Sequence, residues 1–174
     1  MPRQHILGLL RGGDRRSIGQ SGRVASIVSK NPKLFSELMA GLWSGDLLVR
    51  MRAADAAEKV TRAHPEYLKP HKLGLLRLLS TAEQQELRWH LAAMVPRLSL
   101  TAKERSVAVT ALNGYLDDRS SIVKTYALHG LADLAQTAPD LRPAVVETLR
   151  EATRSGTPAM KARARKLLLR LTPI

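Results

Sequence analysis

Apolar and small residues recur along the chain with the period of a helix. In the segment that starts at Val49, positions 0, 4, 7 and 11 are Val49, Ala53, Ala56 and Val60. An α-helix has about 3.6 residues per turn, so this spacing places the four side chains on one stripe. We find neither a sustained alternation of apolar and polar residues nor an Asn-Gly hairpin. The pattern predicts an all-α protein.

The same stripe returns three more times at similar distances along the chain. Its later copies are Leu87, Leu91, Met94 and Leu98; Val123, Ala127, Gly130 and Leu134; and Met160, Ala164, Leu167 and Leu171. The pair Gly13-Asp14 also returns as Gly45-Asp46. Recurrence at intervals of a few dozen residues is typical of a repeat protein. We therefore expect one domain over residues 1–174, with five repeats at approximately 1–31, 32–64, 65–99, 100–138 and 139–174.

Each repeat is expected to contain two helices. First helices are predicted over residues 33–43, 71–79 and 144–152. Ser80 to Glu83 and Thr101 to Glu104 match the capping box that starts a helix, and Thr157-Pro158 matches an N-cap followed by proline. Pro96 falls inside a predicted second helix, which it is expected to kink.

The second-helix segments resemble HEAT repeats, which turn through an aspartate and continue with a Val-Arg-x-x-Ala-like run. Residues 46–53 fit best, residues 118–127 and 160–164 fit less closely, and Ser17 to Ser21 lacks the apolar–basic pair, so the first repeat is degenerate or a cap. The resemblance implies a right-handed α-solenoid of the armadillo type, with second helices on the concave face.

The resemblance also implies a structural role for one regular basic position. In HEAT repeats the basic residue after the first apolar position usually bonds to the turn aspartate of a neighbouring repeat. Here that position holds Arg50, Arg88, Lys124 and Lys161. We expect these four side chains to support the fold more than to bind a ligand.

The chain is strongly basic. It has 28 Lys and Arg against 15 Asp and Glu, a net charge of +13, and both ends are basic: residues 1–30 hold six basic residues and one acidic, and residues 150–174 hold seven and one. Such a balance raises affinity for polyanions.

The absence of cysteine excludes a disulfide scaffold and a thiolate zinc site, and fits a cytoplasmic protein. Apolar runs are too short for a membrane helix or a signal peptide, so no membrane partner is expected.

The predicted binding surface is a ridge on the second helices, opposite the apolar stripe. Positions 3, 6 and 10 lie there, and Trp89 lies beside one of them. The candidate binding residues are Arg52, Lys59, Trp89, His90, Arg97, Tyr126, His129, Arg163, Lys166 and Arg170. Asp55 and Asp133 are the only acidic members of the ridge. The alternative interpretation is a solvated face of loose positive side chains.

Searches for catalytic chemistry find little. HEAT-like alkylation-repair DNA glycosylases carry a tryptophan with a catalytic aspartate four residues later, but here Trp89 is followed by Ala93 and Trp43 by Leu47. The histidines show no metal-ligand spacing, and the glycine-rich start lacks the ending of a phosphate-binding P-loop. We expect no enzyme activity, no metal and no cofactor. A hydrolase or lyase that uses His90 and His129 would require a pocket.

The sequence thus favours a non-catalytic HEAT-repeat scaffold that binds an acidic macromolecular partner, protein or nucleic acid, on its concave face. The alternative is a nucleic-acid-binding protein related to the glycosylases without their catalytic aspartate. Aromatic residues make up only 3% of the chain, so such binding would use the nucleic-acid backbone rather than base stacking.

Overall fold

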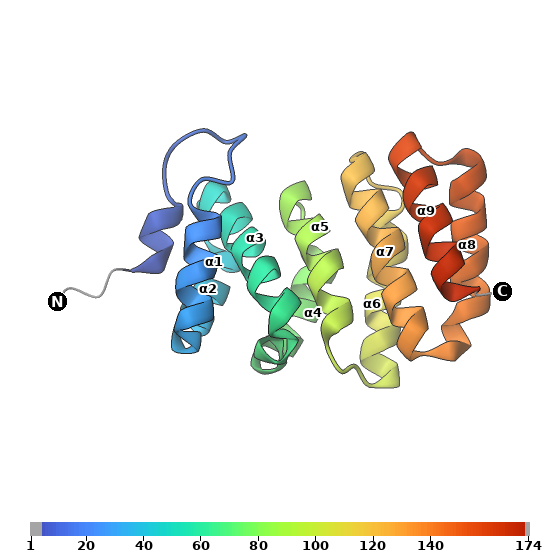
Figure 1. The fold of residues 1–174 in the computed structure, drawn as a ribbon, viewed down its shortest axis with the longest axis horizontal. Coiled ribbons are helices and arrows are strands. Elements are labelled where there is room, and N and C mark those ends of the chain that lie inside the picture. The colour runs from blue at the N-terminus through green and yellow to red at the C-terminus, as the bar shows by residue number, and fades with distance from the viewer. Residues whose placement is uncertain (1–4, 173–174) are drawn as a thin grey trace. The chain divides into compact units, whose positions relative to one another are not determined.

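The computed structural model describes residues 5–172. Residues 1–4 and 173–174, the outer ends of the predicted first and fifth repeats, lie outside the described residues. Within the described part every regular element is a helix, which confirms the all-α class (Figure 1). The chain divides into two compact units, with the boundary between His71 and Lys72. We call them unit 1 and unit 2.

Unit 1 is built around one long helix. Its elements are η1 (Ile6–Leu10), α1 (Ser21–Lys30), η2 (Pro32–Leu34), α2 (Phe35–Ala40), η3 (Gly41–Trp43), α3 (Leu47–Ala63) and η4 (Pro65–His71), where η marks a 3-10 helix. Both α1 and α2 pack against α3, and η1 contacts all three helices. The predicted helix over 33–43 is confirmed as α2 with a 3-10 turn on each side.

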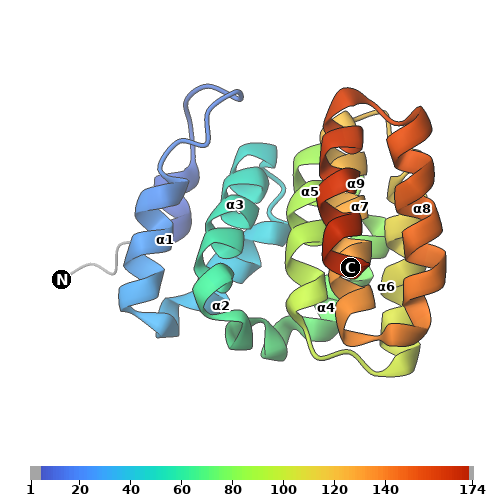
Figure 2. The same cartoon turned by 45° about the vertical axis from the view of Figure 1, so that its right-hand side comes forward.

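Unit 2 consists of helix pairs. Its elements are α4 (Lys72–Thr81), α5 (Gln85–Met94), η5 (Val95–Arg97), α6 (Ala102–Tyr115), α7 (Ser121–Thr137), η6 (Pro139–Leu141), α8 (Arg142–Ser155) and α9 (Pro158–Leu171). Helix α7 packs against α5 on one side and α9 on the other, so these three stand side by side (Figures 1 and 2). Helices α6 and α8 pack against α7 from behind this layer, and α4 packs against α5 and α6.

The predicted apolar stripe lies in the buried interior of the two units. Every one of its positions is buried except Met160, which is partly exposed. Gly130 shows why small residues are needed there: a Cβ atom at this position would lie only 2.7 Å from the backbone oxygen of Ala92 on α5. The stripe therefore combines burial of apolar surface with close approach of neighbouring helices.

Two of the three predicted helix starts are confirmed. Thr101 forms a complete capping box with Glu104, and the Thr157 side chain accepts from the Met160 N–H at the start of α9. The prediction for Ser80 is wrong, because α4 continues to Thr81 and the Ser80 hydroxyl donates to the carbonyl of Leu76 within that helix.

The expected kink at Pro96 is also wrong. Helix α5 ends at Met94, and Pro96 lies in the 3-10 turn η5. Proline lacks an N–H and its ring clashes with the carbonyl four residues earlier, so the helix stops instead of bending. Leu98 is nevertheless buried, as the stripe predicts.

No helix in the described part of the chain combines the length and apolar character needed to cross a membrane.

Candidate functional site

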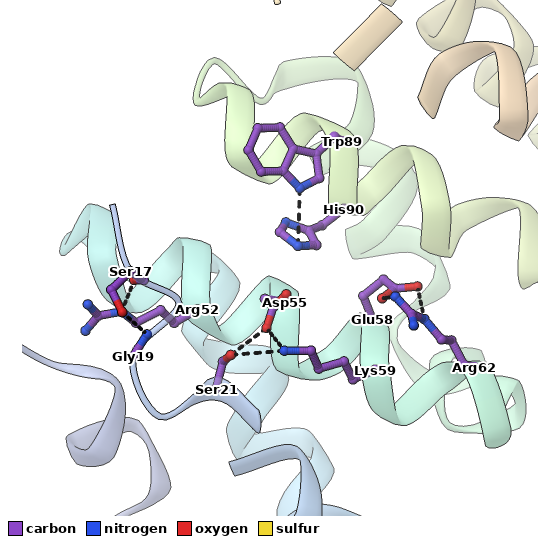
Figure 3. Close-up of polar contacts among 10 residues, drawn as sticks. All are labelled: Ser17, Gly19, Ser21, Arg52, Asp55, Glu58, Lys59, Arg62, Trp89 and His90. Carbon is purple, nitrogen blue, oxygen red and sulfur yellow. Dashed lines mark hydrogen bonds and ion pairs between the residues drawn. The ribbon is translucent and has the colours of Figure 1, made fainter. Parts of the chain in front are cut away.

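The first predicted binding residue, Arg52, lies in the interior of unit 1. Its side chain points from α3 into the loop that joins η1 to α1 (Figure 3), and the residue is only 2% exposed. The guanidinium donates to four backbone carbonyls: Nε to Ser17 (3.1 Å), Nη1 to Leu10 (2.8 Å) and Gly12 (2.6 Å), and Nη2 to Asp14 (2.9 Å). A buried charge requires such partners. Arg52 therefore holds this loop in place, and its guanidinium does not lie on a surface.

The loop, residues 11–20, is shaped around that guanidinium. Gly12, Gly13 and Gly19 have positive φ angles of 70°, 82° and 52°, which other residues rarely adopt. A Cβ on Gly19 would lie 2.8 Å from Arg52 Cζ. Local bonds close the turns, since Asp14 Oδ1 accepts from the N–H of Arg16 and Gly19 N–H donates to Ser17 Oγ. We call residues 11–20 the arginine loop.

Lys59, the second predicted residue, is paired within unit 1. Asp55 Oδ2 accepts from Lys59 Nζ at 2.5 Å and from Ser21 Oγ at 2.5 Å, which joins α3 to α1 (Figure 3). Ser21 is fully buried, and Lys59 also approaches its hydroxyl at 3.4 Å. The pairing neutralises the Lys59 charge locally, and the burial of Ser21 excludes an accessible serine nucleophile at this point.

Arg88, one of the four regular basic residues, bonds to an aspartate in a turn and to a backbone carbonyl. Its Nη1 lies 2.5 Å from Oδ2 of Asp118, in the turn before α7, and its Nε donates to the carbonyl of Ala82. Burial would raise the pKa of Asp118, but the N–H of Ser120 and the Arg88 guanidinium outweigh it and hold that pKa below its usual value. Arg50 differs, because it donates to the carbonyl of Ser44 in the turn before its own helix.

Trp89 and His90 form a packed pair on α5 rather than a flat contact surface. His90 is 8% exposed, and its Nδ1 lies 2.6 Å from the carbonyl oxygen of Glu86. Nδ1 therefore carries the proton, which leaves Nε2 to accept from the indole N–H of Trp89 at 3.3 Å (Figure 3). These contacts hold the imidazole of His90 in one orientation inside unit 2.

Five of the predicted residues lie on the neighbouring helices α7 and α9. Arg163 Nη1 lies 2.5 Å from His129 Nδ1, and the Arg163 guanidinium stands 6.0 Å from the centre of the Tyr126 ring. Arg170 Nη2 donates to Asp133 Oδ1 at 2.7 Å. Lys166 is exposed on α9 between these two arginines in the sequence. We call Tyr126, His129, Asp133, Arg163, Lys166 and Arg170 the α7–α9 face.

His129 is held neutral at this face. Burial lowers its pKa most, the Asp133 carboxylate opposes this, and the positive charges of Arg163, Arg170 and Arg97 lower it further. An arginine only donates, so Nδ1 accepts from Arg163 and Nε2 carries the proton toward Asp133 Oδ2, 3.5 Å away. Arg97 thus lies close enough to act on the face electrostatically.

Asp55 and Asp133, the two ridge carboxylates, are paired with Lys59 and Arg170. No cluster of three His, Asp or Glu side chains in the described chain could hold a metal ion. A cavity beside α8 is lined by apolar residues, by two hydroxyl residues and by three carboxylates that are not predicted site residues: Asp117, Glu147 and Glu151.

Sequence reasoning missed the arginine loop. Arg11, Arg15 and Arg16 are exposed there, whereas the regular ridge pattern led to Arg52 and Lys59. The available signal was the clustering of glycines within a basic segment at the start of the chain.

A search of protein-family models finds no match to the chain, and a search of curated proteins finds no significant match.

Proposed function

We propose that this protein is a non-catalytic scaffold of HEAT-like helix pairs, wound as a right-handed α-solenoid, that binds an acidic macromolecular partner. The partner would bind the α7–α9 face. Support for the repeat architecture comes from the stripe positions, which bury the same side of α3, α5, α7 and α9. Such scaffolds present their second helices as extended binding surfaces.

The observation that carries the proposal is the charge of α9. Arg163, Lys166 and Arg170 occupy one side of this helix, against the single carboxylate of Asp133. His129 is neutral and adds no charge. A guanidinium has five N–H donors, and the bonds to α7 orient Arg163 and Arg170 while they use only part of that capacity.

The same contacts also prepare the face for binding. Long basic side chains lose rotamer freedom when a partner orders them, by about 0.5–1.5 kcal/mol each. Arg163 and Arg170 are already held by His129 and Asp133, so a carboxylate-rich partner would meet them in a defined orientation. Charge complementarity of this kind sets specificity and association rate.

A binding measurement with a fluorescein-labelled Glu/Asp-rich peptide tests the proposal. Lys166→Glu should weaken binding about tenfold. Arg165→Glu is the matched control, because Arg165 is the exposed neighbour on the same helix and points about 100° away from Lys166. It should change the Kd by less than about twofold. Equal losses for the two variants, or no binding by the native protein, would overturn the proposal.

The alternative function is nucleic-acid binding at the same face, by a relative of the DNA glycosylases without the catalytic aspartate. The net charge of +13 and the Arg163 guanidinium over Tyr126 favour it. Its signature would be affinity for duplex or single-stranded oligonucleotides that Lys166→Glu reduces and that falls steeply between about 50 and 200 mM salt. Such a result, without binding of the acidic peptide, would replace the scaffold proposal.

A further inference from the structure

We propose that the arginine loop is a second binding element, and that its ligand is the phosphodiester backbone of a nucleic acid. This element lies in unit 1 and is independent of the α7–α9 face. Two features of the loop carry the inference: what it exposes and how it is held.

The loop exposes three arginines that form no ion pair within the described part of the chain. Arg11, Arg15 and Arg16 are all exposed, and among the described residues their side chains make no ion pair or side-chain hydrogen bond. The only acidic residue between positions 5 and 30 is Asp14, whose Oδ1 accepts the backbone N–H of Arg16. The arginines of the α7–α9 face, in contrast, are already bonded to α7.

Arg52 orders the loop and turns three of its carbonyl dipoles, together with that of Leu10, toward the interior. The carbonyl oxygens of Leu10, Gly12, Asp14 and Ser17 are all directed inward to the guanidinium. Outward carbonyls would repel an anion, so this arrangement favours an anionic ligand outside the loop. The backbone is ordered before binding, which reduces the conformational entropy that binding would otherwise cost.

The chemistry of the loop favours a phosphodiester backbone over an acidic protein surface. A planar guanidinium can donate two parallel N–H hydrogen bonds to two oxygens of one phosphate. Three guanidinium groups within six residues suit a ligand with closely and regularly spaced charges, and duplex DNA carries one charge per about 1.7 Å of its axis. The loop contains no aromatic residue for base stacking, so backbone contacts would dominate.

The charge test compares two triple variants. The loop variant is Arg11→Gln/Arg15→Gln/Arg16→Gln, and the control is Arg77→Gln/Arg119→Gln/Arg142→Gln, which removes three exposed arginines from unit 2. Fluorescence anisotropy with a labelled DNA duplex is measured from about 50 to 200 mM NaCl. We expect the loop variant to lose at least about tenfold in affinity and to lower the slope of log K against log salt by up to about 3, with much smaller changes in the control.

The order of the loop is tested without any change in charge. Gly19→Ala adds a Cβ that meets the Arg52 guanidinium at a positive φ, whereas Gly22→Ala adds one into open space at the start of α1. We expect Gly19→Ala to weaken DNA binding about threefold or more and Gly22→Ala to leave it unchanged, with circular dichroism confirming that both variants are folded.

Three outcomes would overturn the inference. The first is equal loss in the two triple variants, which would show a general charge effect. The second is no binding of duplex or single-stranded DNA at about 50 mM salt. The third is binding of anionic lipid vesicles or of the acidic peptide that depends on the loop arginines while DNA binding does not. The first two results leave the Lys166 and Arg165 comparison with the acidic peptide unaffected, whereas acidic-peptide binding that needs the loop arginines and not Lys166 would overturn both proposals.

Discussion

Arg52 and Arg16 carry the same guanidinium group in opposite surroundings. The Arg52 guanidinium is enclosed by four carbonyl oxygens. Arg16 belongs to the loop that Arg52 holds, and it is exposed to solvent. Arg163 represents a third situation, in which the charge is bonded to a neutral histidine. The environment of each arginine therefore decides whether it stabilises the fold or remains available to a ligand.

Arg52→Lys is expected to destabilise the protein by about 2–5 kcal/mol. Lysine keeps the charge, but its compact ammonium cannot reach four carbonyls that are arranged around a planar fork, and buried carbonyls that lose their donors are costly. Urea unfolding measures the change in the free energy of unfolding. Arg16→Lys is the control and should stay within about 0.5 kcal/mol; a similarly small effect of Arg52→Lys would contradict the role assigned to Arg52.

The pKa of His129 is expected to lie below the usual histidine value of about 6.5. Burial and the neighbouring arginines disfavour the charged ring, so Arg163→Gln should raise this pKa and Asp133→Asn should lower it, as followed by NMR titration of the ring protons. Arg165→Gln serves as control and should leave it unchanged.

The same group links stability to pH. Because the folded-state pKa lies below the unfolded one, the unfolded chain binds more protons between the two values. The stabilising contribution is complete above about pH 6.5 and is lost as the pH falls through the folded-state pKa. An unchanged His129 pKa in Arg163→Gln would show that the Arg163 contact has no electrostatic effect.

At the scale of the element, helices α4 to α9 are defined by how they start and how closely they approach one another. Thr101 and Ser80 stand in the same four-residue motif, yet only Thr101 caps a helix, because the chain at Ser80 is still inside α4. Gly130 and Gly114 both lie in helices, but only Gly130 faces a neighbouring backbone. The first pair shares a motif and the second a residue type, so the surrounding structure decides the role of each member.

Gly130→Ala is expected to destabilise unit 2, although alanine is the better helix former. Its Cβ would meet the Ala92 carbonyl oxygen at 2.7 Å and Leu112 Cδ1 at 3.2 Å, and overpacking of this kind costs about 1–3 kcal/mol. Gly114→Ala adds a Cβ into open space on α6 and should stabilise by about 0.5–1 kcal/mol. Thermal and urea unfolding compare the two variants, and changes of the same sign would contradict the close approach of α7 to α5.

At the scale of the whole molecule, the dominant property is the excess of positive charge. A net charge of +13 on 174 residues produces self-repulsion in the folded state. Ion pairs such as Arg88–Asp118, Lys72–Glu104 and Arg170–Asp133 offset it locally. The arginine loop lacks such pairs and adds to the repulsion.

Stability is therefore expected to rise as NaCl increases from about 10 to 200 mM, because the screening length falls from about 30 Å to below 10 Å. The triple variant Arg11→Gln/Arg15→Gln/Arg16→Gln has a lower net charge and should show a weaker salt dependence. Urea unfolding at each salt concentration gives the measurement. A decrease in the free energy of unfolding with salt would show that ion pairs outweigh repulsion in this protein.

The sequence by itself determined the helical class, the existence of α3, α5, α7 and α9, and nearly all of the buried stripe. These features follow from the spacing of side chains on a single helix, which needs no knowledge of neighbours, and Val49, Leu91 and Leu134 are buried as that spacing predicts. The caps at Thr101 and Thr157 are equally local, because both partners lie within four residues.

Only the tertiary structure decided which polar residues are available for binding. Arg52 and His90 occupy the same ridge position as Arg163, but a loop more than 30 residues away encloses Arg52, and helix packing buries His90. Helical periodicity indicates the direction in which a side chain points from the axis of the helix that carries it. It contains no information on which distant carbonyl or carboxylate lies there, and such partners determine whether a charge is neutralised, buried or free to meet a ligand.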